Sequence, residues 1–265
     1  MMARLPVAKT YKLYVGGAFP RSESGRSYEV EGANVARASR KDVRDAVRAA
    51  RAGFGAWAAA TASNRGQVLY RIAEMLDGRR SQFAALAGDE GEVDEAVDRW
   101  VWYAGWADKL AQVLGSSNPV SGPYFNFSVP EPVGVVGIVA PESPPLAGLV
   151  SRLAPAIVGG NAAVVLASER RPLAAVTLAE VLATSDVPAG VVNILTGRKE
   201  ELAPALAAHL DVDALDLAGA ADDRGELERL AAENVKRVVR SGAGQSPWHA
   251  AAFLEMKTVW HPIGV

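Results

Sequence analysis

Hydrophobic and polar positions follow two different patterns on either side of residue 130. Before it, apolar side chains recur every three or four positions, which is the spacing of one face of a helix. Residues 12–15 and 28–30 come earlier and predict a short extended arm. The helices that the spacing predicts are one from Lys41, one from Ser63 as its N-cap, and one from Glu92 to Leu114.

After residue 130, short apolar runs alternate with segments of helical spacing. Residues 133–140 (VGVVGIVA) are apolar on both faces, which is typical of a strand buried on both sides of a sheet. Strict alternation of strands and helices requires right-handed crossovers and a parallel sheet with helices on both faces. The predicted strands are 133–140, 162–166, 191–195, 214–217 and 236–240, and the predicted helices are 144–158, 173–183, one across Leu202 to Leu210, and 224–234.

The predicted fold class is therefore α/β, with a doubly wound, Rossmann-like parallel sheet. In such a sheet a ligand crevice lies beyond the carboxyl ends of the strands. The last predicted strand, Phe253 to Trp260, has no neighbour in sequence, so we expect it to cap a sheet edge of its own chain or to join a sheet in another subunit. The expected division is an extended arm (1–39), a helical part (40–130), the αβ core (131–241), and a linker with the terminal strand (242–265).

Composition narrows the classes of partner. The 265 residues include 28 basic and 30 acidic side chains, and a net charge of -2 provides no field for nucleic acid or an anionic membrane. The chain has no cysteine, which excludes disulfides and thiol chemistry and is compatible with a reducing compartment. We find no signal peptide and no apolar run of membrane-spanning length, so we expect a cytoplasmic protein.

Candidate binding side chains have structural interpretations that we favour. Trp100, Trp102 and Trp106 suggest an aromatic ligand box, but aromatic residues beside apolar helical positions usually fill a core. The acidic run at 88–98 is expected to be a solvated helix start rather than a metal site. None of the histidines has metal-ligand spacing, and we expect structural roles for His209, whose imidazolium would meet a helix end, and for His249 and His261.

Several segments carry a family resemblance in order and in register. They are RLAPAIVGGN (152–161), PLAAVTLAEVL (172–182), VPAGVVNILTG (187–197), HLDVDAL (209–215), VKRVV (235–239) and FLEMKTVW (253–260). The chain resembles the aldehyde dehydrogenase superfamily over nearly its whole length. The resemblance implies the family's cofactor domain, and it implies assembly through the N-terminal arm and the C-terminal strand, as a homo-oligomer or a hetero-oligomer.

The resemblance also implies cofactor-binding residues, namely Ser168, Glu169 and Gly219, with NAD or NADP as the possible cofactor. The family's Lys-Pro-Ser-Glu motif reads Leu-Ala-Ser-Glu at 166–169, so the ribose-binding lysine is absent while Glu169 remains. The family's Phe-Thr-Gly-Ser reads Leu-Ala-Gly-Ala at 217–220 and keeps only Gly219. Asp222 and Asp223 follow, where acids would repel a phosphate, and we interpret them as helix caps.

The family's reacting groups have no counterparts that we can assign. Its oxyanion-binding asparagine falls in Pro141 to Pro145, where Glu142 brings a charge that opposes an oxyanion. Its general base aligns near Ser241, its nucleophile is a cysteine, and the chain passes from SGAGQSP directly to the terminal segment without the family's catalytic domain. We therefore predict no catalytic residue.

Three hypotheses follow for function. The first is a non-catalytic subunit that acts as scaffold or regulatory partner of a cysteine-bearing aldehyde dehydrogenase. The second is a nucleotide-binding module without turnover, and the third is an active NAD(P)-dependent aldehyde oxidoreductase.

Overall fold

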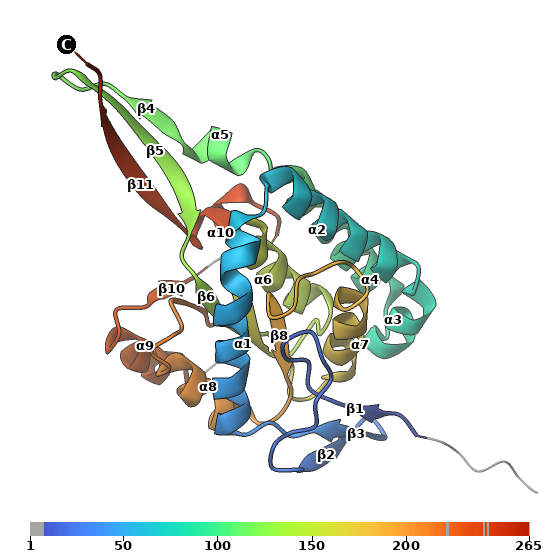
Figure 1. Ribbon diagram of the computed structural model, residues 1–265. Helices are drawn as coiled ribbons and strands as arrows, with labels where there is room; N and C mark the ends of the chain where they lie inside the picture. The colour runs from blue at the N-terminus through green and yellow to red at the C-terminus, as the bar shows by residue number, and fades with distance from the viewer. Residues whose placement is uncertain (1–7, 221–222, 241, 243, 265) are drawn as a thin grey trace, which may run out of the picture.

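A five-stranded parallel sheet forms the centre of the molecule. The computed structural model describes residues 8–220, 223–240, 242 and 244–264. The strand order is β10-β9-β6-β7-β8 and every pairing is parallel, which confirms the predicted doubly wound α/β class (Figure 1). The strands are β6 (Val135–Val139), β7 (Ala162–Leu166), β8 (Val192–Leu195), β9 (Ala214–Asp216) and β10 (Arg237–Val239).

Helices cover both faces of this sheet because its side chains alternate between two apolar cores. Val136 and Ile138 of β6 join one core, whereas Val135 and Val139 join the other. The first core contains α2 (Ala62–Asp77), α3 (Arg80–Ala87), α4 (Glu90–Trp106), α6 (Ala147–Val158) and α7 (Leu173–Leu182). The second contains α1 (Arg40–Ala59), α8 (Lys199–Ala207) and α9 (Arg224–Ala232).

The helical part differs from the prediction in three places. The cap of α2 is Thr61 rather than Ser63, and its hydroxyl accepts the Asn64 N–H at 3.2 Å. Helix α3 was not predicted; it ends at Gly88, whose φ of 77° favours glycine. The predicted helix 92–114 is two helices, α4 and α5 (Leu110–Leu114), and the Lys109 ammonium donates to the Gly105 carbonyl at the end of α4.

The three tryptophans of α4 serve the core, as the packing interpretation predicts. Trp100 is completely buried, and Trp102 and Trp106 pack partly buried against the same cluster. No helix within the described ranges combines the length and apolarity needed to cross a membrane.

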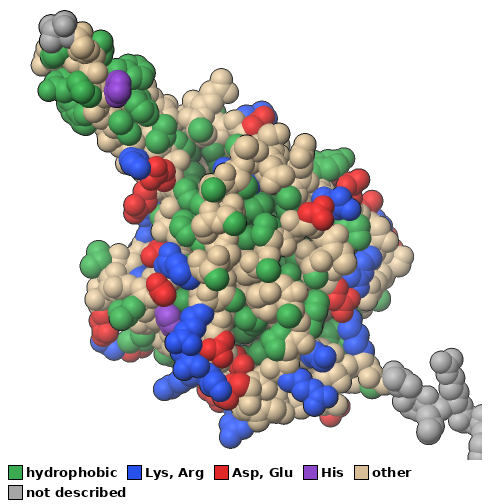
Figure 2. Space-filling view, in the orientation of Figure 1, with side chains coloured by type: hydrophobic (Ala, Val, Ile, Leu, Met, Phe, Trp, Pro, Cys, Tyr) green, Lys and Arg blue, Asp and Glu red, His purple; other side chains and the backbone are tan. Residues whose placement is uncertain are grey.

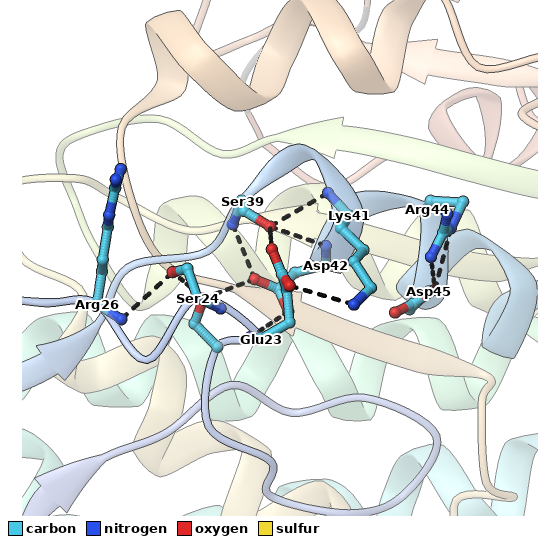
Figure 3. Close-up of polar contacts among 9 residues, drawn as sticks. Glu23, Ser24, Arg26, Ser39, Lys41, Asp42, Arg44 and Asp45 are labelled. Atoms are coloured by element: carbon cyan, nitrogen blue, oxygen red, sulfur yellow. Dashed lines mark hydrogen bonds and ion pairs between the residues drawn. The ribbon is translucent and has the colours of Figure 1, made fainter.

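The N-terminal arm forms a small sheet of its own and is fastened to the start of α1. Strands β1 (Thr10–Tyr11), β3 (Ala33–Ala36) and β2 (Ser27–Val30) lie in that order. The buried Asp42 carboxylate accepts the Ser22 hydroxyl at 2.8 Å, the Glu23 N–H at 3.1 Å and the Ser39 N–H at 2.8 Å. Ser39 and Asp42 thereby complete a capping box that also holds the arm (Figure 3).

The C-terminal strand pairs with its own chain, but not with the central sheet. Strand β11 (Leu254–Pro262) runs antiparallel to β5 (Tyr124–Pro132) over the whole length of both, from Leu254 opposite Pro132 to Pro262 opposite Tyr124. Strand β4 (Ser116–Asn118) completes the order β11-β5-β4, and α10 (Pro247–Ala251) precedes β11. These three strands, here called the projecting sheet, extend away from the body (Figure 1).

The capping box generates a stability prediction. Asp42→Ala leaves three donors of the arm and helix without their acceptor, so we expect the free energy of unfolding to fall by about 2–3 kcal/mol. Asp45→Ala is the matched control, because Asp45 lies one turn further along α1 and pairs only with exposed Arg44; its cost should be below about 0.5 kcal/mol. Urea denaturation measures both. Equal effects of the two substitutions would contradict this role of Asp42.

Candidate functional site

A crevice at the carboxyl ends of the parallel strands lies beside the point where the chain order reverses. Strand β6 continues through α6 to β7 on one side, while β9 lies on its other side, and open α/β sheets bind ligands at this switch point. The crevice has a volume of about 300 Å³. Its charged lining residues are Glu142, Glu169, Arg170, Lys199, Glu200 and Asp223.

Glu142 is the centre of the crevice's polar network. Its carboxylate accepts the Ser168 hydroxyl at 2.8 Å and the N–H groups of Glu169 and Arg170 at 3.2 and 3.1 Å. It also forms an ion pair with the Lys199 ammonium, which donates a second bond to the Ala140 carbonyl at 2.6 Å. Burial raises the pKa of Glu142, but bonds from Lys199, the Arg170 N–H and Ser168 outweigh it and hold the pKa below its usual value.

This network adds a partner to Glu142 that the sequence did not indicate. We predicted that its negative charge opposes an oxyanion on the loop after β6, and the side chain pairs with Lys199 across the crevice. Neither Arg198 nor Lys199 was predicted as a site residue. Their position in the sequence could have indicated them. They lie directly before and at the start of the helix after β8, and the carboxyl ends of parallel strands lie at the same edge of the sheet as the crevice.

Ser168 and Glu169, two of the predicted cofactor residues, lie together at the end of β7 and are engaged within the chain. The Ser168 hydroxyl donates to Glu142 and accepts the Arg171 N–H at 3.0 Å. The Glu169 carboxylate pairs with Arg198 and accepts the Lys199 N–H at 3.0 Å. Both of these interactions of the Glu169 carboxylate are therefore made with residues at the start of α8.

Gly219, the third predicted residue, lines the same crevice and has a packing reason to be glycine. Its N–H donates to the Val139 carbonyl at 2.9 Å. A Cβ at this position would lie 1.9 Å from the Ala140 carbonyl oxygen, so no side chain fits against the end of β6.

The helix-cap interpretation of the two acids after Gly219 is confirmed for the position of Asp223 but not for a capping hydrogen bond. It is the N-cap residue of α9, but with φ −80° and ψ −3° its side chain makes no capping bond. An N-cap residue whose side chain accepts a helical N–H has an extended backbone, which turns that side chain toward the second or third helical N–H. Asp222 and Ser241, the position aligned with the family's general base, lie outside the described residues.

The acidic run is a largely exposed helix start, as predicted, except at Glu92, and one histidine departs from expectation. Glu92 is buried rather than solvated, and it accepts the N–H groups of Leu146 and Ala147 at 2.5 and 3.1 Å, satisfying the start of α6. Burial lowers the pKa of His209, which opposes the expected imidazolium, and its Nδ1 accepts the Asp211 N–H at 3.1 Å. Among the described residues, no group of three His, Cys, Asp or Glu side chains is arranged to hold a metal ion.

Comparison with known proteins decides the family. The model of the aldehyde dehydrogenase family matches residues 26–260. The chain belongs to the aldehyde dehydrogenase family. It is 32% identical over 257 residues to the putative aldehyde dehydrogenase DhaS of Bacillus subtilis (strain 168), covering 90% of this chain and 51% of that protein.

Solved structures that resemble this chain have the same fold. HpcC from Thermus thermophilus superposes with a TM-score of 0.83 at 30% identity, over 87% of this chain and 47% of HpcC. The NAD+ complex of the Bacillus cereus aldehyde dehydrogenase gives 0.81 at 28% identity, over 87% of this chain and 50% of that one. The chain thus spans about half the length of the curated relatives it matches.

The crevice does not suit the dinucleotide that the family implies. Four carboxylates line it against two cations, Arg170 and Lys199, and this balance repels a pyrophosphate. The ribose-binding carboxylate that the resemblance assigns to Glu169 already pairs with Arg198. The cofactor role of Ser168, Glu169 and Gly219 stays a prediction, and the contacts around these residues oppose it.

The packing of Gly219 generates the second stability prediction. Gly219→Ala places a methyl group on the Ala140 carbonyl and should lower the free energy of unfolding by about 2–3 kcal/mol through overpacking. In the control Gly225→Ala the new methyl group meets open space in α9, and helix propensity should make the change neutral or stabilising by up to about 1 kcal/mol. Denaturation curves of both variants test this. A harmless Gly219→Ala would contradict the packing account.

Proposed function

We propose that the chain is a non-catalytic aldehyde dehydrogenase-family subunit that works by assembly with a cysteine-bearing subunit of the same family. The observation that carries the proposal is a contrast between two ends of the fold. The crevice at the carboxyl ends of the strands is lined by side chains that form ion pairs within the chain itself, whereas the projecting sheet presents uncovered apolar side chains. The family chemistry uses a thiolate nucleophile, and this sequence contains no cysteine.

Exposed hydrophobic side chains concentrate on the projecting sheet and the residue after it. Five of the eleven large hydrophobic side chains that are exposed among the described residues belong there, and Figure 2 shows the apolar surface gathered over this projection. They are Tyr124, Phe125, Met256, Trp260 and Ile263. A concentration of exposed apolar side chains is typical of a protein interface.

Both faces of the projecting sheet carry aromatic residues. Phe125 and Phe127 lie on one face with ring centroids 5.3 Å apart, and Tyr124 meets Trp260 edge to face at 5.7 Å on the other. Strand β11 is an edge of this sheet in the described part of the chain, so its outer backbone groups can accept a further strand. A partner can therefore combine backbone pairing with burial of aromatic side chains.

The family chemistry favours a hetero-oligomer over a homo-oligomer. Copies of this chain bring no cysteine to each other, whereas a full-length family member contributes the nucleophile. In such a hetero-oligomer the chain acts as a scaffold or regulatory subunit, because the active site belongs to the partner.

Co-expression with cysteine-bearing aldehyde dehydrogenases tests the proposal. We expect a complex of defined stoichiometry by native mass spectrometry, with a change in the partner's kcat or KM. A chain that remains monomeric and leaves every candidate's kinetics unchanged would contradict it.

The chain by itself should form no NADH. With NAD and a panel of aldehydes, highly purified protein is expected to show no aldehyde-dependent absorbance at the NADH wavelength, because it has no thiolate to form the covalent intermediate. Aldehyde-dependent turnover that follows this chain through purification would instead support the active oxidoreductase hypothesis.

Charge on the projecting sheet should break the complex. Phe125, 49% exposed, and Trp260, 59% exposed, lie on opposite faces, and replacing both by Glu should weaken binding at least about 30-fold, as loss of an aromatic anchor does. Tyr70→Glu is the matched control, because Tyr70 is 52% exposed but lies on α2 in the body. Its affinity should stay within about twofold of wild type. Equal losses in the double variant and the control would place the interface elsewhere.

A further inference from the structure

Four donors converge on one carboxylate in the crevice. The Ser168 hydroxyl, the N–H groups of Glu169 and Arg170 and the Lys199 ammonium all point to Glu142. Ser168 is 2% exposed, and the Lys199 side chain is 13% exposed, so the donors are held in place by surrounding structure. We call these four donors the anion nest.

The anion nest has the chemistry of an oxyanion site. Successive backbone N–H groups form a concavity for anions, and a hydroxyl with an ammonium adds charge-assisted bonds. Ser168 lies in the segment that follows β7, and Lys199 begins the helix that follows β8, so the connections after two adjacent strands supply the donors. Glu142 reaches them from the loop after β6 on the other side of β7.

A carboxylate of the same chain competes strongly for such a site. Because Glu142 is tethered, its effective concentration at the nest greatly exceeds that of a dissolved ion. An external anion can bind only if it displaces Glu142 and overcomes the repulsion of the freed carboxylate. The Glu142 side chain borders the 300 Å³ crevice, so a displacing ligand has a route to it.

We propose that Glu142 is an internal anion that occupies a latent phosphate site and keeps phosphate-bearing ligands out of the crevice. The ligand class of the latent site is a phosphate group, either free or carried by a nucleotide. The inference concerns access to the crevice and is independent of the proposed assembly, because the projecting sheet lies at the opposite end of β6.

The experiment measures phosphate binding by the full chain and its variants with isothermal titration calorimetry. Inorganic phosphate, AMP and NADP are titrated separately, which distinguishes free phosphate from nucleotide phosphate. Glu142→Ala should bind at least one of the three at least tenfold more tightly than wild type, because it vacates the nest and removes one negative charge. Glu142→Gln, which removes the charge but keeps the side chain's size, should show a smaller gain.

Two further variants separate the nest from general electrostatics. Glu200→Gln removes the same charge from the crevice lining without a contact to the nest, so its affinities should stay within twofold of wild type. Adding Lys199→Ala to Glu142→Ala should abolish the gain. Circular dichroism and thermal unfolding verify that each variant is folded.

Three results would overturn the inference. The first is that wild type binds phosphate as tightly as Glu142→Ala. The second is that the Glu142 variants fold but bind none of the three ligands more tightly than wild type. The third is that Glu200→Gln gains as much affinity as Glu142→Ala. None of these outcomes bears on assembly, which the native mass of the complex tests separately.

Discussion

The position of the projecting sheet relative to the body depends on the hydrogen bonds of the buried Asn161 amide. Its oxygen accepts the Gly134 N–H at the start of β6, and its nitrogen donates to the carbonyls of Ala156 in α6 and Phe253 before β11, each at 2.9 Å. A fully buried amide must satisfy these groups or lose several kcal/mol, on the order of the desolvation cost of each. One side chain therefore joins segments that are 92 residues apart and sets where the projecting sheet begins.

The two ends of β6 lead to surfaces of different chemistry, one apolar and the other charged. At its amino end, the Asn161 contact leads through β5 into a sheet whose aromatic side chains are uncovered. At its carboxyl end, Glu142, Lys199 and Glu169 satisfy one another's charges and hydrogen bonds together with Arg198. Uncovered apolar surface favours association with a protein, whereas internally satisfied charges disfavour a charged small molecule. The proposed role in assembly follows from this difference rather than from the fold, which many active family members share.

Local pattern was sufficient to predict most of the central sheet but little of the site. Strand β7 has the predicted bounds, 162–166, because burial on both faces leaves a continuous apolar run between clear breaks. Of the residues that the resemblance implied, Glu169 and Gly219 line one crevice and Ser168 bonds to Glu142 beside it, yet the resemblance could not indicate that Glu142 and Lys199 pair across 57 residues. Glu92 looked like a solvated helix start because its partners, the N–H groups of α6, are backbone groups that no side-chain pattern reveals.

Hydrogen–deuterium exchange of the chain, alone and with a cysteine-bearing aldehyde dehydrogenase subunit, tests the central claim most directly. Assembly through the projecting sheet predicts that slowed exchange on adding the partner concentrates in β5 and β11, with little change around the crevice. Unchanged exchange in both strands, or protection confined to the crevice segments after β6, β7 and β9, would contradict it.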